Sequence, residues 1–99
     1  MERKIIWTKT AFKTFQDIAN YLEKQWSLKI AKNFVANTEK KLEQIKENPE
    51  SCIASNKDKT IRKTTITKHN SMFYRVRENT LVILAFFDNR KNPKKNKYS

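Results

Sequence analysis

Residues Leu81 to Phe87 form an unbroken apolar run, and this run limits the possible folds more than any other part of the chain. Two segments before it, Ile61–Lys68 and Met72–Arg77, alternate apolar and polar residues with the period of half-buried strands. An apolar run after two such strands predicts a central strand that is covered on both faces. The polar breaks at residues 69–71 and 78–80 predict hairpin turns, so the three strands are expected to form an antiparallel meander.

The N-terminal half predicts one strand and two helices. In Lys4–Thr8 the side chains of Ile5 and Trp7 share one face, and Thr8 then stands where a helix N-cap belongs. Ser27 is a second candidate N-cap, and Asn48-Pro49 ends the second helix because proline disfavours helical geometry in the residue before it. Apolar residues recur at helical spacing in both helices and are expected to form the core: Phe12, Phe15, Ala19, Leu22 and Trp26, then Ala31, Phe34, Val35, Leu42 and Ile45.

These elements predict an α+β fold in the order β-α-α-β-β-β. The helices form an N-terminal αα-hairpin that packs on one face of a four-stranded antiparallel sheet, with the first strand beside the last. At 99 residues the chain is expected to hold a single domain, residues 1–93, followed by a basic C-terminal tail, residues 94–99.

Positive charge is concentrated in the C-terminal part of the chain. The net charge is +12, and residues 57–99 contribute +9 of it, from 12 Lys/Arg against 3 Asp/Glu. Such an excess favours a polyanion or an acidic protein as the partner. A basic surface also keeps a small domain soluble, so the charge alone does not identify the partner.

Several classes of site are excluded by composition. The chain has no glycine, which excludes glycine-rich phosphate loops and Rossmann fingerprints. Its one cysteine, Cys52, provides neither a disulfide framework nor a thiolate set for zinc. No signal peptide and no run of about 20 apolar residues is present, so we expect a cytoplasmic protein without membrane contact. No cofactor or metal ion is predicted.

The order of these elements, together with particular residues, resembles the RelE/ParE superfamily of bacterial type II toxins. The resemblance covers most of the chain and rests on Trp7-Thr8, Ala11, Ile18 to Leu22, Trp26-Ser27, Asn48-Pro49, Ile61-Arg62, Tyr74-Arg75-Val76 and Arg90-Lys91-Asn92-Pro93. It implies a growth-inhibiting toxin that a cognate antitoxin holds inactive. Given the charge, we expect that antitoxin to be acidic.

The superfamily has two kinds of target. RelE-like members resemble ribosome-dependent endonucleases that cut mRNA, whereas ParE-like members act on DNA gyrase and are not known as nucleases. By resemblance to the RelE pattern, Arg62 and Arg90 match two basic positions, but Thr64 and Ser71 stand where two further basic residues are expected. The missing residues favour a ParE-like, non-nuclease toxin. A RelE-like nuclease is the alternative, and a non-toxic basic nucleic-acid-binding module is a third, so enzymatic activity stays open.

Two groups of side chains are the candidate site residues. The first would serve catalysis in the RelE-like alternative: Arg62, Arg90, His69 and Tyr98. The second would contact nucleic acid or another target: Arg75, Arg77, Lys91, Lys94 and Lys95. His69 can equally be a solvated turn residue, and Tyr74 is expected to be a core residue rather than a catalyst.

Overall fold

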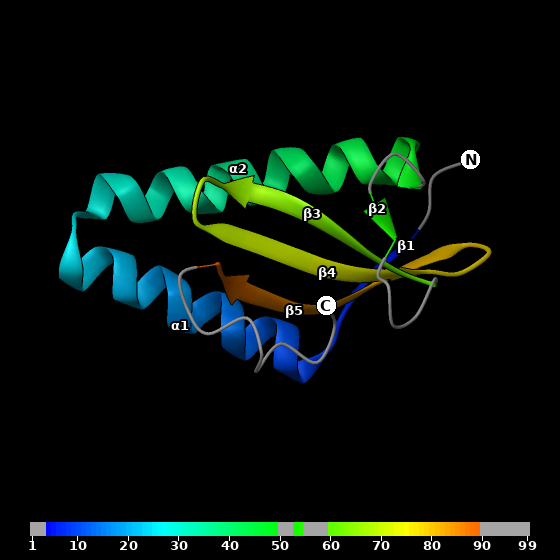
Figure 1. Cartoon of the computed structure of the whole chain (residues 1–99), viewed down its shortest axis with the longest axis horizontal. Coiled ribbons are helices and arrows are strands. Elements are labelled where there is room, and N and C mark those ends of the chain that lie inside the picture. Colours follow the sequence, from blue (N-terminus) through cyan, green and yellow to red (C-terminus); the bar gives the residue numbers. More distant parts are fainter. Residues whose placement is uncertain (1–3, 50–52, 55–59, 90–99) are drawn as a thin grey trace.

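The computed structural model describes residues 4–49, 53–54 and 60–89 of the chain. Its elements follow the predicted order, with one short strand added (Figure 1). They are β1 (Lys4–Trp7), α1 (Lys9–Gln25), α2 (Leu28–Glu47), β2 (Ile53–Ala54), β3 (Ile61–Thr67), β4 (Asn70–Val76) and β5 (Thr80–Asp88). The predicted N-caps are confirmed, because the Thr8 side chain accepts a hydrogen bond from the Ala11 amide and Ser27 accepts one from the Ile30 amide.

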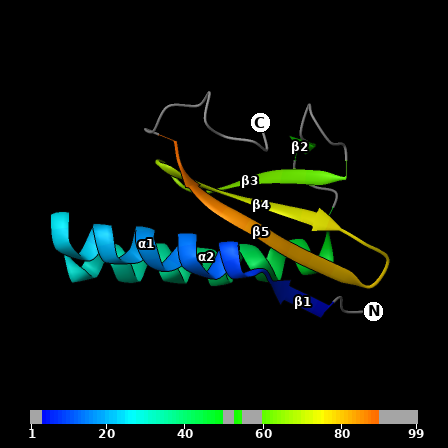
Figure 2. The same cartoon turned by 90° about the horizontal axis from the view of Figure 1, so that it is seen from below.

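The strands form one sheet in the order β1-β5-β4-β3-β2. The apolar run forms β5, which is an interior strand between β1 and β4. The prediction that it is covered on both faces is wrong, because the side chains of β5 largely alternate between buried and half-buried and the helices cover one face (Figure 2). The β1–β5 pair is parallel, with Lys4 opposite Thr80 and Trp7 opposite Ile83, whereas the prediction was an antiparallel sheet. Two hairpins separate β3 from β5, so these strands run in the same direction, and β1 runs that way too. The unpredicted β2 has two residues and pairs antiparallel with β3.

The αα-hairpin covers one face of the sheet and leaves the other uncovered by helix, which confirms the α+β prediction (Figure 2). The core lies between these layers and includes Phe34, Ile45, Met72, Leu81 and Ile83, each at most 1% exposed. An aromatic group within it joins β1, both helices and β5 through ring centroids 5.1–6.2 Å apart: Trp7, Phe15, Phe34 and Phe86. In the described parts of the chain neither helix is long and apolar enough to span a membrane.

Two residues assigned to the core from their spacing lie on the surface instead. Phe12 is 56% exposed and Trp26 is 61% exposed. The side of α1 that faces the sheet is defined by Ala11 and Leu22, and Phe12 is one position beyond it. Trp26 is the C-cap, with φ of −125°, so its backbone has already left the helix.

The first hairpin turn is shorter than predicted. The break was placed at residues 69–71, but only Lys68 and His69 form the turn, and β4 begins at Asn70. Asn70 and Ser71 are buried, at 2% and 0% exposed. These polar side chains can be buried because each has a hydrogen-bond partner: Asn70 Oδ1 accepts from Thr67 Oγ1 at 2.7 Å, and Ser71 Oγ donates to Asn89 Oδ1 at 2.9 Å.

Two threonines at the start of α1, the N-cap Thr8 and Thr14, form hydrogen bonds with the part of β5 that lies beyond the end of β1. The β4–β5 register shifts between Phe73 and Tyr74, which pair with Ala85 and Ile83, so Leu84 is an additional residue in β5. Thr8 Oγ1 donates to the carbonyls of Ile83 and Leu84 at 3.0 and 3.1 Å. Six residues later, Thr14 Oγ1 accepts a hydrogen bond from the Phe86 amide at 2.9 Å. The two hydroxyls therefore fix the start of α1 against the bulge.

We predict that Thr14→Val lowers the free energy of unfolding by about 1–3 kcal/mol, because the Phe86 amide loses its acceptor in a partly buried place. Thr10→Val is the matched control, since Thr10 is exposed on the same helix. Urea denaturation of both variants measures the difference. Equal destabilisation by the two substitutions would show that the hydrogen bond to β5 is not the cause.

Candidate functional site on the open face of the sheet

The face of the sheet turned away from the helices carries basic and apolar side chains. Met72, Tyr74 and Ile83 belong to the core beneath the helices, so their alternating neighbours point to the open face. Among the described residues three rows of paired residues cross β3, β4 and β5 on this face, and none of these residues is acidic: Ile61–Arg75–Val82, Lys63–Phe73–Ala85 and Thr65–Ser71–Phe87.

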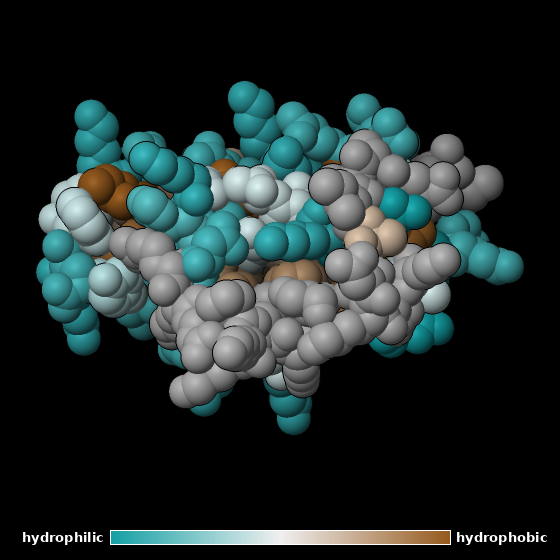
Figure 3. Space-filling model, in the orientation of Figure 1, coloured by the Kyte–Doolittle hydropathy of each residue, from teal (hydrophilic) through white to brown (hydrophobic). Residues whose placement is uncertain are grey.

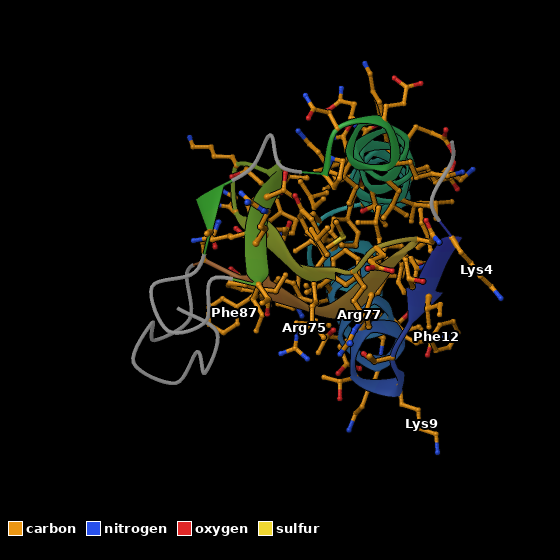
Figure 4. The ribbon with its side chains drawn as sticks, turned by 90° about the vertical axis from the view of Figure 1, so that its right-hand side faces the viewer. Lys4, Lys9, Phe12, Arg75, Arg77 and Phe87 are labelled. Atoms are coloured by element: carbon orange, nitrogen blue, oxygen red, sulfur yellow. The ribbon has the colours of Figure 1, made fainter. Side chains whose placement is uncertain are left out.

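Arg75 lies in the middle of this face. It is half-buried on β4, with Ile61 and Val82 paired to it on either side, so its position is set by a regular strand. Arg77 is exposed just beyond the end of β4, and Figure 4 shows it on the same side of the molecule as Arg75. A guanidinium held in this way can donate two parallel hydrogen bonds to a carboxylate or a phosphate.

Further cations and an aromatic side chain lie along the neighbouring edge of the molecule. Figure 4 shows Lys4 at the start of β1, and Lys9 and Phe12 at the start of α1, along one side of the molecule. All three side chains are exposed. Arg75, Arg77 and these residues therefore give one side of the molecule a basic surface with exposed aromatic carbon.

A group of hydrogen bonds fixes the end of β5 beside the first hairpin. The Asn89 amide donates to the His69 carbonyl at 2.7 Å, and Ser71 Oγ donates to Asn89 Oδ1. Ser71 is the residue at which the RelE pattern expects an arginine. Here its hydroxyl is fully buried and positions the residue that precedes Arg90. Arg90, Lys91, Lys94, Lys95 and Tyr98 lie outside the described residues.

The structure does not bring Arg62 and His69 together. Arg62 is half-buried near the start of β3 and pairs with Tyr74, which places it on the side of the helices. His69 is exposed in the turn at the other end of that strand. The rise of a strand puts about 17 Å between Arg62 and the end of β3. Arg62 also lies on the face opposite Arg75, so the predicted basic residues of the middle strands do not form one group.

Tyr74 is a core residue, as predicted. It is 0% exposed, and its hydroxyl donates to the Pro49 carbonyl at 2.9 Å, which ties β4 to the end of α2. A side chain enclosed in this way is not placed to meet a substrate.

No group of three or more His, Cys, Asp or Glu side chains suited to a metal ion occurs in the described part of the chain.

Phe73 and Phe87 were not predicted as site residues, and both alternate onto the open face beside the basic residues, Phe87 half-buried and Phe73 buried at 1% exposed. A signal for them was present. Met72, Phe73 and Tyr74 are consecutive apolar residues, and such a run on a strand places apolar side chains on both faces of the sheet.

Comparisons with known proteins agree with this architecture. The family model described as ParE toxin of type II toxin-antitoxin system, parDE, matches residues 5–93. Among solved structures, the chain is similar to a chromosomal ParDE toxin–antitoxin system from P. aeruginosa, with a TM-score of 0.72, 15% identity, and 88% of this chain and 96% of that chain covered.

Two further solved structures share the fold. A YoeB dimer from Staphylococcus aureus has a TM-score of 0.62 and 17% identity, covering 86% of this chain and 94% of its own. A YoeB/ParE toxin from Agrobacterium tumefaciens has a TM-score of 0.62 and 14% identity, with 86% and 96% covered. The search of curated protein sequences gives no significant match.

We predict that Arg75→Gln and Arg77→Gln each weaken binding to a polyanion such as heparin and reduce the slope of log affinity against log salt by about one. Lys40→Gln, on the exposed side of α2, is the control of equal charge change. Affinity measurements across a series of salt concentrations give the slopes. An unchanged slope in both arginine variants would exclude the open face as the anion-binding surface.

Proposed function

The chain belongs to the ParE toxin family of type II toxin–antitoxin systems, and we propose that it inhibits growth by binding DNA gyrase, without cleaving nucleic acid. The family membership rests on a match over nearly the whole chain. The choice of gyrase over the ribosome is the part that we propose, and the arrangement of the described basic residues supports it.

The separation of Arg62 from His69 and Arg75 is the observation that carries the proposal. Cleavage of RNA needs a base for the 2′-hydroxyl, an acid for the leaving oxygen and a donor for the phosphate charge, all within reach of one phosphate. Among the described residues, Arg62 lies on the helix side, His69 lies at the far end of β3, and Ser71 replaces an arginine. These residues do not converge on one point.

The composition of the open face also supports binding to a protein. Arginine and aromatic residues are enriched at protein–protein interfaces, and they dominate the binding energy there. On this face Arg75 on β4 and Phe87 on β5 are half-buried, whereas Phe73 beside them is buried at 1% exposed. A mixed surface of this kind suits an acidic and partly apolar protein surface better than it suits a bare phosphate chain.

The partner that neutralises the toxin is, in this proposal, an acidic antitoxin that covers the open face and the basic tail. Charge favours this surface, since residues 57–99 carry a net +9. A second surface offers a contrast: an apolar groove of about 320 Å³ between the helices, lined by residues that include Trp7, Phe12, Phe15, Val35 and Leu42.

We predict that Arg90→Ala relieves growth arrest without unfolding the protein, and that Arg90→Lys rescues only part of the activity, because a lysine does not reproduce bidentate contact. Asp88→Ala is the control for the removal of a neighbouring charge. Growth is measured on induction, together with DNA supercoiling and protein synthesis. Our proposal requires supercoiling to be inhibited first, whereas early arrest of protein synthesis with cut mRNA would identify a RelE-like nuclease. Full toxicity from a folded Arg90→Ala protein would remove Arg90 from the mechanism.

We further predict that Arg75→Glu and Arg77→Glu weaken binding of the antitoxin by about tenfold or more, because a like-charge contact replaces an attraction. Lys40→Glu on α2 should leave the affinity unchanged. Titration calorimetry with the purified antitoxin tests this, and the rise in melting temperature on binding should fall in parallel. An antitoxin that binds both arginine variants with full affinity would place its binding site elsewhere, for example in the groove between the helices.

A further inference from the structure

A pocket of about 380 Å³ lies between the α1–α2 turn and the β3–β4 hairpin, at the opposite end of β3 from Arg62. Its volume is at the small end of the range for ligand sites, so it suits one small molecule rather than a folded segment. Buried apolar side chains form its inner part, Leu22 at 7% and Phe34 at 1% exposed. Trp26, which is 61% exposed, forms part of its outer wall.

Exposed apolar residues gather around the mouth of this pocket. Leu28 and Ile30 are 53% and 40% exposed at the start of α2, next to Trp26. Figure 3 shows a hydrophobic patch at this end of the molecule, surrounded by hydrophilic residues. A large exposed indole beside such residues, with a hollow behind it, is a place where a flat ring can stack.

The polar side chains of the pocket are mainly amides. Asn33 and Asn37 both line it and are four residues apart on α2, so they lie on the same side of the helix, roughly 6 Å apart. Each amide offers both a donor and an acceptor, which is the pattern that reads the edge of a nucleobase. Lys68 and His69 line the pocket from the hairpin, and no acidic residue is among the described residues that line it.

Asn70 provides an independent observation. Its side chain is 98% buried, since its exposure is 2%, and it lines the pocket. Its Oδ1 accepts from Thr67, but its Nδ2 has no acceptor among the groups that the structure describes. A buried amide donor without an acceptor raises the free energy of the folded state. Nδ2 is closed to solvent, so a ligand reaches it only if the side chain turns and gives up the hydrogen bond from Thr67.

We infer that this pocket binds a purine mononucleotide. The ring stacks against Trp26 above the buried phenyl group of Phe34, its edge bonds to the amides of Asn33 and Asn37, and the phosphate lies near Lys68. The same base can come from a free nucleotide or from an unpaired end of a nucleic-acid strand, because both present one ring and one phosphate. The inference does not rest on the gyrase proposal, since the pocket is separate from the open face.

Titration of the whole protein with AMP and GMP tests this inference, using calorimetry for the affinity and tryptophan fluorescence for the stacking. Trp7 is packed against Phe15 and Phe86 in the core, so quenching by the ligand reports on Trp26. We expect dissociation constants of about 10 μM to 1 mM and clear quenching. Ribose 5-phosphate and inorganic phosphate lack the ring and should bind at least about tenfold more weakly.

The double variant Asn33→Ala/Asn37→Ala should weaken AMP binding by about tenfold or more, because two ring contacts are lost. Asn20→Ala, on the exposed side of α1, is the matched control and should bind normally. A short single-stranded RNA or DNA ending in adenine distinguishes the two sources, since tighter binding than AMP identifies a strand end. The inference is overturned if no nucleotide binds at millimolar concentration, if phosphate alone binds as tightly as AMP, or if the double variant matches the control.

Discussion

The fold depends on how the start of α1 is fixed to the bulged edge of β5. Thr8 continues the hydrogen bonds of β1 onto β5, and Thr14, six residues later, accepts a hydrogen bond from the Phe86 amide. Without these hydroxyls, polar backbone groups of a central apolar strand would lie unsatisfied next to the core, which is costly. The same contacts determine the direction of α1 across the sheet. Trp7 and Phe15 can then pack on Phe86, and α2 follows to complete the aromatic group.

Because both helices pack on one face of the sheet, the side chains of the other face are not covered by helix. On the face of β3, β4 and β5 turned away from the helices, Arg75 and Phe87 are half-buried, and the regular strands hold them at fixed positions. The alternation of a strand also separates neighbours in the sequence. Arg62 and Lys63 are adjacent in the sequence but lie on opposite faces of the sheet. The basic residues of the middle strands are therefore divided between the two faces. This separation is why we favour recognition of a protein over cleavage of RNA.

Buried polar residues mark the hairpin end of the sheet as a second specialised region. Ser71 and Asn70 open β4 with side chains that are nearly fully buried, although serine and asparagine usually favour turns. Ser71 gains a partner in Asn89 and so fixes the end of β5 just before Arg90. Asn70 shares a hydrogen bond with Thr67 and retains one unmet donor beside the pocket. Natural sequences tolerate such local costs mainly at functional sites.

The sequence by itself determined every described element except β2, their order, both N-caps, the end of α2 and the interior place of the run Leu81–Phe87, because these depend on local periodicity, on capping hydroxyls and on proline. Only the tertiary structure decided the parallel pairing of β1, the exposure of Phe12 and Trp26, and the burial of Asn70 and Ser71. Each of these depends on a partner distant in sequence, such as Asn89 for Ser71, which periodicity does not contain. For the same reason the sequence named Arg62, His69 and Arg75 as candidate site residues, while the register of β3 and β4 decided that they do not meet.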